Sequence, residues 1–157
     1  MKIKLLAIGK TDQPELNELI DSYQKRLKHY ISFEIEIIPD VKNSKSFNQS
    51  QLKEKEGQLI LSKIQGGDVL VLLDEKGQQF RSIEFSEYLQ KKMNAAAKQL
   101  VFVIGGAYGF SEDVYKIAQE KISLSKMTFS HQMIRLFLAE QLYRSFTILK
   151  NEPYHHE

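Results

Sequence analysis

The hydrophobic positions of this chain fall into short continuous runs, separated by longer segments that are amphipathic. Five runs of aliphatic and β-branched residues predict strands: 3–8, 33–38, 68–73, 100–104 and a short one over 122–125. Runs that are apolar at every position suit strands covered on both faces, and helix-length connections suit crossovers between parallel strands. The pattern therefore predicts one α/β domain over residues 1–157, with a parallel sheet and helices on both faces.

Three helices are expected between these strands. Asp12 and Glu15 form a capping box for the first, whose apolar residues then recur on one face: Leu16, Leu19, Ile20, Tyr23, Leu27 and Tyr30. Another is expected to begin with Ser82 as its cap, and a weaker one is interrupted by Gly57. The stretch 41–50 is polar and lacks periodicity, which predicts a mobile surface loop.

The segment 132–149 predicts a last helix that is apolar around most of its circumference. Ile134, Leu138 and Leu142 lie near one face, and further apolar residues occupy the others: Met133, Leu136, Phe137, Tyr143 and Phe146. A sheet covers only one face of such a helix, so a second copy of the chain is the natural cover for the rest. We therefore expect a homodimer built on this helix. The alternative is a central core helix in a monomer.

Composition and charge exclude several classes of protein. With 42% hydrophobic and 27% charged residues, the chain has neither the composition of a disordered segment nor that of a coiled coil. No apolar run approaches the roughly 20 residues of a membrane span, and the first residues do not resemble an export signal. A net charge of +2 permits an RNA partner without arguing for one. We expect a cytoplasmic protein, with neither a membrane nor DNA as partner.

Cysteine and histidine usage argues against several kinds of site. The chain has no cysteine, which excludes disulfides, thiolate metal ligands and a cysteine nucleophile. Its four histidines are His29, His131, His155 and His156, and they lack the spacing of a zinc site. We therefore expect no bound metal.

The glycine turn after the strand 100–104 is the most informative stretch. Its spacing, Gly105-Gly-Ala-Tyr-Gly109, does not match the dinucleotide fingerprint. Glu112 and Asp113 open the next helix, where they would repel a pyrophosphate. Glycine does let the backbone approach a ligand such as S-adenosylmethionine, with its uncharged adenine edge and cationic sulfonium. The alternative is that the glycines only make a tight strand-to-helix turn.

A second segment, Leu124-Ser-Lys-Met-Thr-Phe129, follows the end of the last predicted strand. Open α/β sheets bind ligands at the carboxyl ends of their strands. The glycine turn and this segment are therefore expected to form two sides of one small-molecule pocket. His131, just beyond it, either orients a substrate or serves as a structural hydrogen-bonding residue.

Further motifs extend along the whole chain: Lys4-Leu-Leu-Ala-Ile-Gly-Lys10, Lys55-Glu-Gly57, Gly109-Phe110, Arg135, Glu140-Gln-Leu-Tyr-Arg144 and Pro153-Tyr-His155. Together with the glycine turn and the 124–129 segment, they resemble the RlmH-type family of SPOUT RNA methyltransferases from end to end. One departure is Ser130, where that family usually carries proline. Proline would stiffen the loop, so we expect cofactor binding to be retained but weaker.

The resemblance implies a specific activity and a specific fold. The activity is S-adenosylmethionine-dependent methylation of N3 of a pseudouridine in 23S ribosomal RNA. The fold is a parallel-sheet SPOUT fold whose C-terminal part is tied in a trefoil knot, with an active site completed across a dimer. The cofactor contacts it implies fall on Leu73, Gly105, Leu124, Ser125, Lys126, Met127, Thr128 and Phe129.

Three residues near the C-terminus are candidates for the substrate site: Arg144, Tyr154 and His155. Chain ends usually fray, but an aromatic side chain near a target base can stack on it. We therefore expect Tyr154 and His155 to complete the substrate site, in the partner subunit. Arg144 either contacts the RNA or forms an ordinary helix ion pair with Glu140, four residues earlier.

The small net charge leads us to expect the assembled ribosome, rather than naked RNA, as the better substrate. Arg135 and Lys126 are further candidates for contacts with the RNA backbone. Two alternatives stay open: a SPOUT methyltransferase of another RNA, and a dimeric ribosome-associated binding protein without catalysis.

Overall fold

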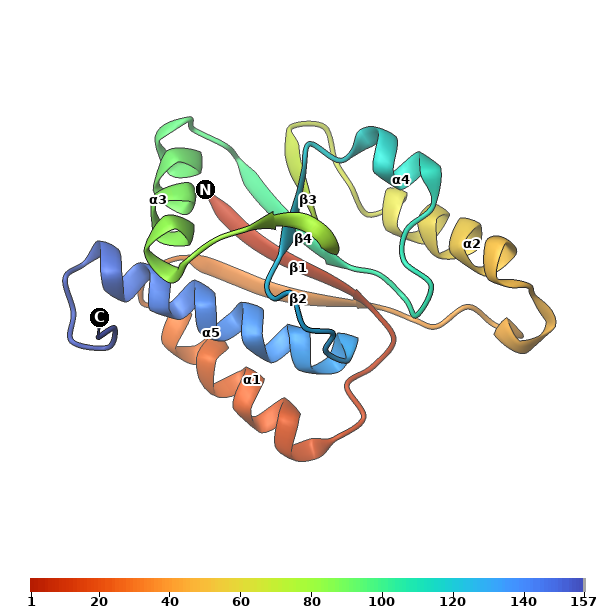
Figure 1. Ribbon diagram of the computed structural model, residues 1–157, viewed down its shortest axis with the longest axis horizontal. Coiled ribbons are helices and arrows are strands. Elements are labelled where there is room, and N and C mark those ends of the chain that lie inside the picture. The colour runs from red at the N-terminus through yellow and green to blue at the C-terminus, as the bar shows by residue number, and fades with distance from the viewer. Residues whose placement is uncertain (157) are drawn as a thin grey trace.

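A computed structural model, in which residues 1–156 are described, contains one five-stranded sheet in the order β2-β1-β4-β3-β5 (Figure 1). Its strands are β1 (Lys2–Ile8), β2 (Ser32–Ile38), β3 (Asp68–Gln79), β4 (Gln99–Ile104) and β5 (Glu120–Ser123). Every neighbouring pair is parallel. The predicted α/β class with a parallel sheet is therefore confirmed, because the apolar runs are the buried strands.

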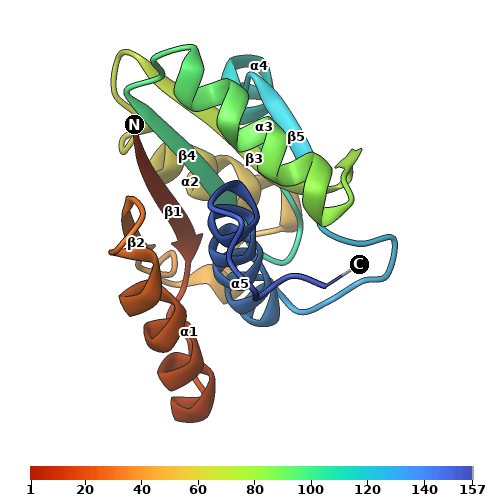
Figure 2. The ribbon, with the colours of Figure 1, turned by 90° about the vertical axis from the view of Figure 1, so that its left-hand side faces the viewer.

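The helices cover both faces of this sheet (Figures 1 and 2). One layer contains α1 (Pro14–Leu27), α3 (Ser82–Asn94) and α5 (His131–Leu149). The other contains α2 (Gln49–Leu61) and α4 (Glu112–Ile117), and a short 3-10 helix, η1 (Ser44–Ser46), precedes α2. Side chains alternate along each strand: Leu5 of β1 packs with the first layer, whereas Leu6 packs with the second. Each layer of helices thus has its own buried core.

Strand β3 is longer than its apolar run predicts. After Leu73 the chain bulges out over residues 74–77, and Gln78 and Gln79 then pair with Ile122 and Ser123 of β5. The two glutamines are polar, so no hydrophobic pattern marks this return to the sheet. The bulge matters for the site, because it projects from the carboxyl edge of the sheet beside the end of β5.

Two predicted helix caps are wrong. Helix α1 begins after Gln13, and Asp12 instead accepts a hydrogen bond from Gln132 Nε2 at 2.8 Å and donates its backbone N–H to Gln132 Oε1 at 3.0 Å. Ser82 is already inside α3, and its hydroxyl donates to Gln141 Oε1 at 2.9 Å. Both polar side chains contact α5, so tertiary contacts replace the local capping bonds.

The predictions around α2 also need correction. The expected loop over 41–50 ends earlier, because Asn48 caps α2: its Oδ1 accepts from Gln51 N at 2.8 Å. Gly57 does not interrupt the helix. It is buried, and a Cβ there would lie 2.2 Å from Ser111 Oγ, the N-cap of α4. Glycine is thus required by the close packing of α2 against α4.

Helix α5 packs against α1 and α3. Leu138, Leu142 and Phe146 are buried, whereas Leu136 and Phe137 are only half-buried. The homodimer on this helix stays a prediction, as does the trefoil knot of the C-terminal part.

Candidate functional site

A cavity of about 520 Å³ lies at the carboxyl edge of the sheet. Three segments form its walls: the β3 bulge, the glycine turn after β4 and the loop after β5. The first turns of α5 close one side through His131 and Ile134. The structure therefore brings together the two segments that the sequence marks as the sides of one pocket, because parallel strands end at the same edge.

Seven of the eight residues expected to contact the cofactor line this cavity: Leu73, Gly105, Leu124, Ser125, Met127, Thr128 and Phe129. Lys126 is exposed and does not line it. The loop is held by its own serines. Ser123 Oγ donates to Ser125 O at 2.8 Å, and Met127 N donates to Ser125 Oγ at 2.9 Å. This shape leaves backbone groups of the loop at the cavity.

The β3 bulge adds a polar wall that the sequence interpretation missed. Asp74, Glu75 and Lys76 line the cavity, and the Tyr115 hydroxyl donates to Asp74 Oδ2. Burial, and then this hydrogen bond, raises the pKa of Tyr115 well above its ordinary range, so the phenol stays protonated. Two carboxylates at the rim favour a cationic ligand. The turn-forming run Asp74-Glu-Lys-Gly77, directly after a strand, is the signal that could have revealed the bulge.

The glycine turn has structural reasons for its glycines. Gly109 has a φ of +80°, which other residues rarely adopt, and its N–H donates to Gly106 O at 3.2 Å. A Cβ at Gly105 would lie 3.0 Å from the Phe110 ring. A Cβ at Gly106 would lie 2.4 Å from a carboxylate oxygen of Glu56. Gly109 thus makes a tight turn, whereas Gly105 and Gly106 lie where a side chain would meet Phe110 or Glu56. Cofactor binding by the backbone of this turn stays a prediction.

Glu56, which lies behind this turn, is a buried carboxylate. It is 7% exposed, and its Oε2 has no hydrogen-bond partner within residues 1–156. Burial, and secondarily the charge of Asp40, raises the pKa of Glu56. A raised carboxyl pKa means that the ionised form is disfavoured in the folded state. The contribution of Glu56 to folding stability is therefore most favourable at a pH below the pKa of the unfolded state, where the carboxyl is protonated. This contribution is lost as the pH rises through the higher pKa of the folded state.

Glu56→Gln is therefore expected to stabilise the protein at pH 7, by about 1 to 3 kcal/mol, because it removes a buried charge without a partner. The advantage should shrink as the pH falls toward about 4, close to the ordinary glutamate pKa, because the unfolded state then also begins to bind the proton. Urea unfolding between pH 4 and 8 measures this difference. Glu54→Gln, an exposed neighbour on α2, is the control and should stay within about 0.5 kcal/mol of the parent. A loss of stability in Glu56→Gln at pH 7 would contradict the argument.

Arg135 does not reach the surface, so the expected contact with RNA backbone is wrong. Its side chain is 1% exposed, and its Nη2 donates to Ile8 O at 2.8 Å while its Nη1 donates to Thr11 Oγ1 at 2.9 Å. Burial lowers its pKa. The guanidinium instead ties the end of β1 to the start of α5, next to the cavity.

Ser130 is the N-cap of α5, and His131 is the first residue of this helix. Ser130 has a φ of −61°, the angle that proline would impose, and its Oγ accepts from Met133 N at 3.2 Å. Serine thus keeps the backbone angle and adds a cap that proline cannot make. The predicted weaker cofactor binding stays a prediction. His131 lines the cavity, and within residues 1–156 its ring makes no hydrogen bond, so the structural interpretation of this histidine is not supported.

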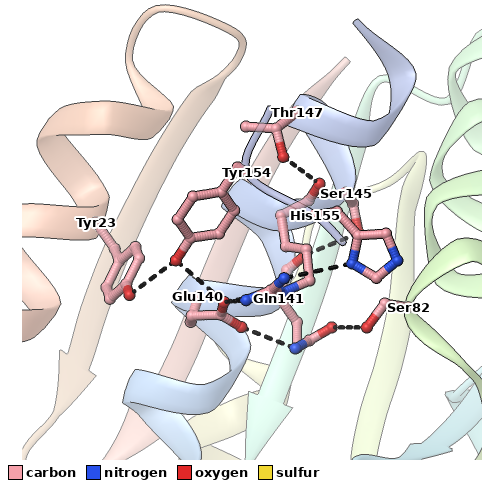
Figure 3. A network of polar contacts seen from close by, with 9 residues as sticks. Tyr23, Ser82, Glu140, Gln141, Ser145, Thr147, Tyr154 and His155 are labelled. Carbon is pink, nitrogen blue, oxygen red and sulfur yellow. Dashed lines mark hydrogen bonds and ion pairs between the residues drawn. The ribbon is translucent and has the colours of Figure 1, made fainter. Parts of the chain in front are cut away.

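The C-terminal tail folds back along α5 and α1 (Figure 3). The Tyr154 hydroxyl lies 3.1 Å from that of Tyr23 and donates to Glu140 Oε1 at 3.2 Å. Arg144 donates to the same oxygen from Nη2 at 2.6 Å, and its Nη1 lies 3.3 Å from His155 Nδ1. The expected ion pair of Arg144 with Glu140 is therefore present, and it is part of a network that also includes Tyr154 and His155.

This network lies at the other end of α5 from the cavity. Arg144 follows His131 by thirteen residues, which is about 20 Å along a helix axis. A smaller cavity of about 290 Å³, lined by Phe129, Phe137 and Glu140 among others, lies between them. One chain thus does not bring the C-terminal candidates into contact with the main cavity.

Metal-binding clusters and membrane-spanning helices are both absent from residues 1–156. No three His, Asp or Glu side chains there lie close enough together to hold a metal ion. None of the helices is both long and apolar enough to cross a membrane.

Comparison with known proteins gives consistent matches over the whole chain. A family model described as "Predicted SPOUT methyltransferase" matches residues 1–155. The chain is 67% identical over 156 residues to a protein of Christiangramia forsetii, covering 99% of both chains. It is 67% identical over 157 residues to one of Flavobacterium johnsoniae and 57% identical to one of Bacteroides thetaiotaomicron, covering 100% of each chain. All three relatives are named ribosomal RNA large subunit methyltransferase H. The chain therefore belongs to the SPOUT methyltransferase family.

Proposed function

We propose that this protein transfers a methyl group from S-adenosylmethionine to N3 of a pseudouridine in 23S ribosomal RNA, in the assembled ribosome of the cytoplasm. Family membership and the names of the relatives support a methyltransferase of large-subunit ribosomal RNA. The observation that carries the proposal is the cavity at the carboxyl edge of the sheet, where the glycine turn meets the loop after β5.

The cavity has the size and chemistry that S-adenosylmethionine requires. Its volume of about 520 Å³ lies within the usual range for small-molecule sites. Backbone groups of Gly105 and of residues 124–129 would hold the uncharged adenosine part. Asp74 and Glu75, at the rim, would favour the positive charges of the sulfonium and the amino group. When bound, the cofactor supplies an electrophilic methyl group.

The tail network supplies groups suited to the RNA base. Burial, and then the hydrogen bond with Tyr23, raises the pKa of Tyr154 above its ordinary range, so its hydroxyl is a donor rather than a base. Arg144 is a fixed cation that would stabilise the negative charge of a deprotonated imide. Since both lie far from the cavity of their own chain, we place them, with His155, at the cavity of the partner subunit.

Two measurements test this function. Calorimetry with S-adenosylmethionine should show binding, whereas a ribosome-associated protein without catalysis should show no heat. Labelled methyl incorporation should be fastest into assembled ribosomes, slower into separated large subunits and slowest into naked ribosomal RNA. Faster modification of naked RNA would contradict the ribosome as substrate. Incorporation into transfer RNA alone would favour a SPOUT methyltransferase of another RNA.

A further inference from the structure

The segment between β2 and the middle of α2 is basic and has no acidic residue over positions 41–53. We call residues 41–53 the lysine segment. Lys42 and Lys45 are exposed, and Lys53 is half-buried. Within residues 1–156, Lys4, Lys63, Lys92 and Lys116 form ion pairs, for example Lys63 with Glu36 at 2.8 Å, and the other lysines do not. Within residues 1–156, none of the three lysines of the segment has such a partner. The exposed ammonium groups of Lys42 and Lys45 are therefore available to an outside ligand, whereas Lys53 shares a cavity with Glu54, Glu112 and Asp113.

The lysine segment lies on the same edge of the sheet as the cavity. It follows the carboxyl end of β2 and projects beyond the sheet (Figure 1). The residues that flank it contact the other strand ends. Asp40 lies against Gly9 at the end of β1, 2.8 Å from the position of a Cβ there. Glu56 lies against Gly106 of the glycine turn. The segment is thus held at the carboxyl edge of the sheet, beside the end of β1 on one side and behind the glycine turn on the other.

Local hydrogen bonds give the lysine segment a defined shape. Asn43 has a φ of +56°, and its backbone oxygen accepts from Ser46 Oγ at 2.7 Å. Asn48 caps α2, and Lys55 places its Nζ 4.7 Å from the centre of the Phe47 ring. The ring is half-buried, so the segment presents polar groups and ammonium groups rather than an apolar patch. Such a surface suits the phosphates of RNA better than the apolar core of a protein interface.

We propose that the lysine segment binds phosphates of the ribosomal RNA next to the target nucleotide and so holds the substrate at the cavity. This proposal rests on the proposed function. It does not require a large net charge, because the exposed ammonium groups of Lys42 and Lys45 can each contact a phosphate. Lysine contacts to phosphate position the RNA without reading its sequence.

The test compares two variants with the same loss of charge. Lys42→Gln/Lys45→Gln removes two ammonium groups from the lysine segment. Lys28→Gln/Lys98→Gln removes two exposed ones from the opposite edge, since Lys28 precedes β2 and Lys98 precedes β4. The first variant should raise KM for ribosomes about tenfold and make binding less dependent on salt, with a slope smaller by about 2. Affinity for S-adenosylmethionine and kcat at saturating ribosomes should be unchanged, and the control should match the parent.

Co-sedimentation with ribosomes separates this proposal from the proposed function, because it needs no catalysis. If the parent protein binds ribosomes through Lys42 and Lys45 but incorporates no methyl group, the proposed function fails and the docking surface stands. If the two variants bind ribosomes equally well at every salt concentration, the lysine segment is not the docking surface.

Discussion

Gly77→Ala is expected to lower the free energy of unfolding by about 3 kcal/mol or more. A Cβ at this position would lie 2.5 Å from both the backbone N and the backbone C of Ile122 in β5. A backbone cannot rotate away as a flexible side chain can, so β5 would have to separate from the second half of β3. Gln78 and Gln79 pair with β5 directly after this glycine, and that pairing should be lost.

Urea unfolding followed by circular dichroism measures this effect. Gly66→Ala is the matched control, because a Cβ there would have nothing within 4 Å and its φ is not positive. We expect that control to stay within about 0.5 kcal/mol of the parent. Equal stability of the two variants would show that the bulge and β5 are not in this close contact. Gly77→Ala should also weaken binding of S-adenosylmethionine, since the bulge and Ile122 both line the cavity.

Arg144→Met is expected to reduce kcat of methyl transfer about 100-fold or more, because it removes the cation proposed to stabilise the deprotonated base. The affinity for S-adenosylmethionine should be unchanged, because the proposal assigns Arg144 to the RNA base and not to the cofactor. Single-turnover methylation of ribosomes and calorimetry with the cofactor measure the two quantities. Tyr154→Phe, which removes one hydroxyl from the same network, should have a smaller effect in the same direction.

Arg26→Met is the control for this variant. Arg26 also lies over tyrosine rings, 5.4 Å from the centre of Tyr23 and 5.6 Å from that of Tyr143, but it is exposed on α1. The Arg26→Met variant loses the same positive charge close to the tyrosine rings of α1 and α5, and it should keep the kcat of the parent. An Arg144→Met variant that lost cofactor binding, rather than turnover, would contradict the assignment of this residue to the RNA substrate.

A mixed dimer tests whether the partner subunit completes the site. Chains carrying Arg144→Met are mixed with chains carrying Thr128→Trp, which places a large side chain at an exposed position that lines the cavity. If each active site combines the cavity of one chain with the tail of the other, mixing two inactive variants should restore part of the activity. No recovery, with mixed dimers present, would place the whole site within one chain.

Much of the cavity was predictable from the sequence because its walls are strand ends. Apolar runs locate the strands, and parallel strands end at one edge, so the glycine turn and the 124–129 segment were expected at the same edge. The strand order, which places β4 and β5 on either side of β3, comes from the tertiary structure. The third wall was missed. Residues 74–79 are mostly polar, and neither the bulge nor the pairing of Gln78 and Gln79 with β5 leaves a periodic pattern.

The sequence by itself determined the apolar parts of the strands, their parallel arrangement, the long α5 helix and the edge of the sheet that carries the cavity, because these depend on hydrophobic burial and on local glycine and helix propensity. Only the tertiary structure decided the roles of Asp12, Ser82 and Arg135, which hydrogen-bond between elements far apart in the chain. It also decided why Gly57 and Gly77 must be glycine, since the atoms that would clash with a side chain belong to other elements. Such contacts arise only when the chain packs, and no local pattern records them.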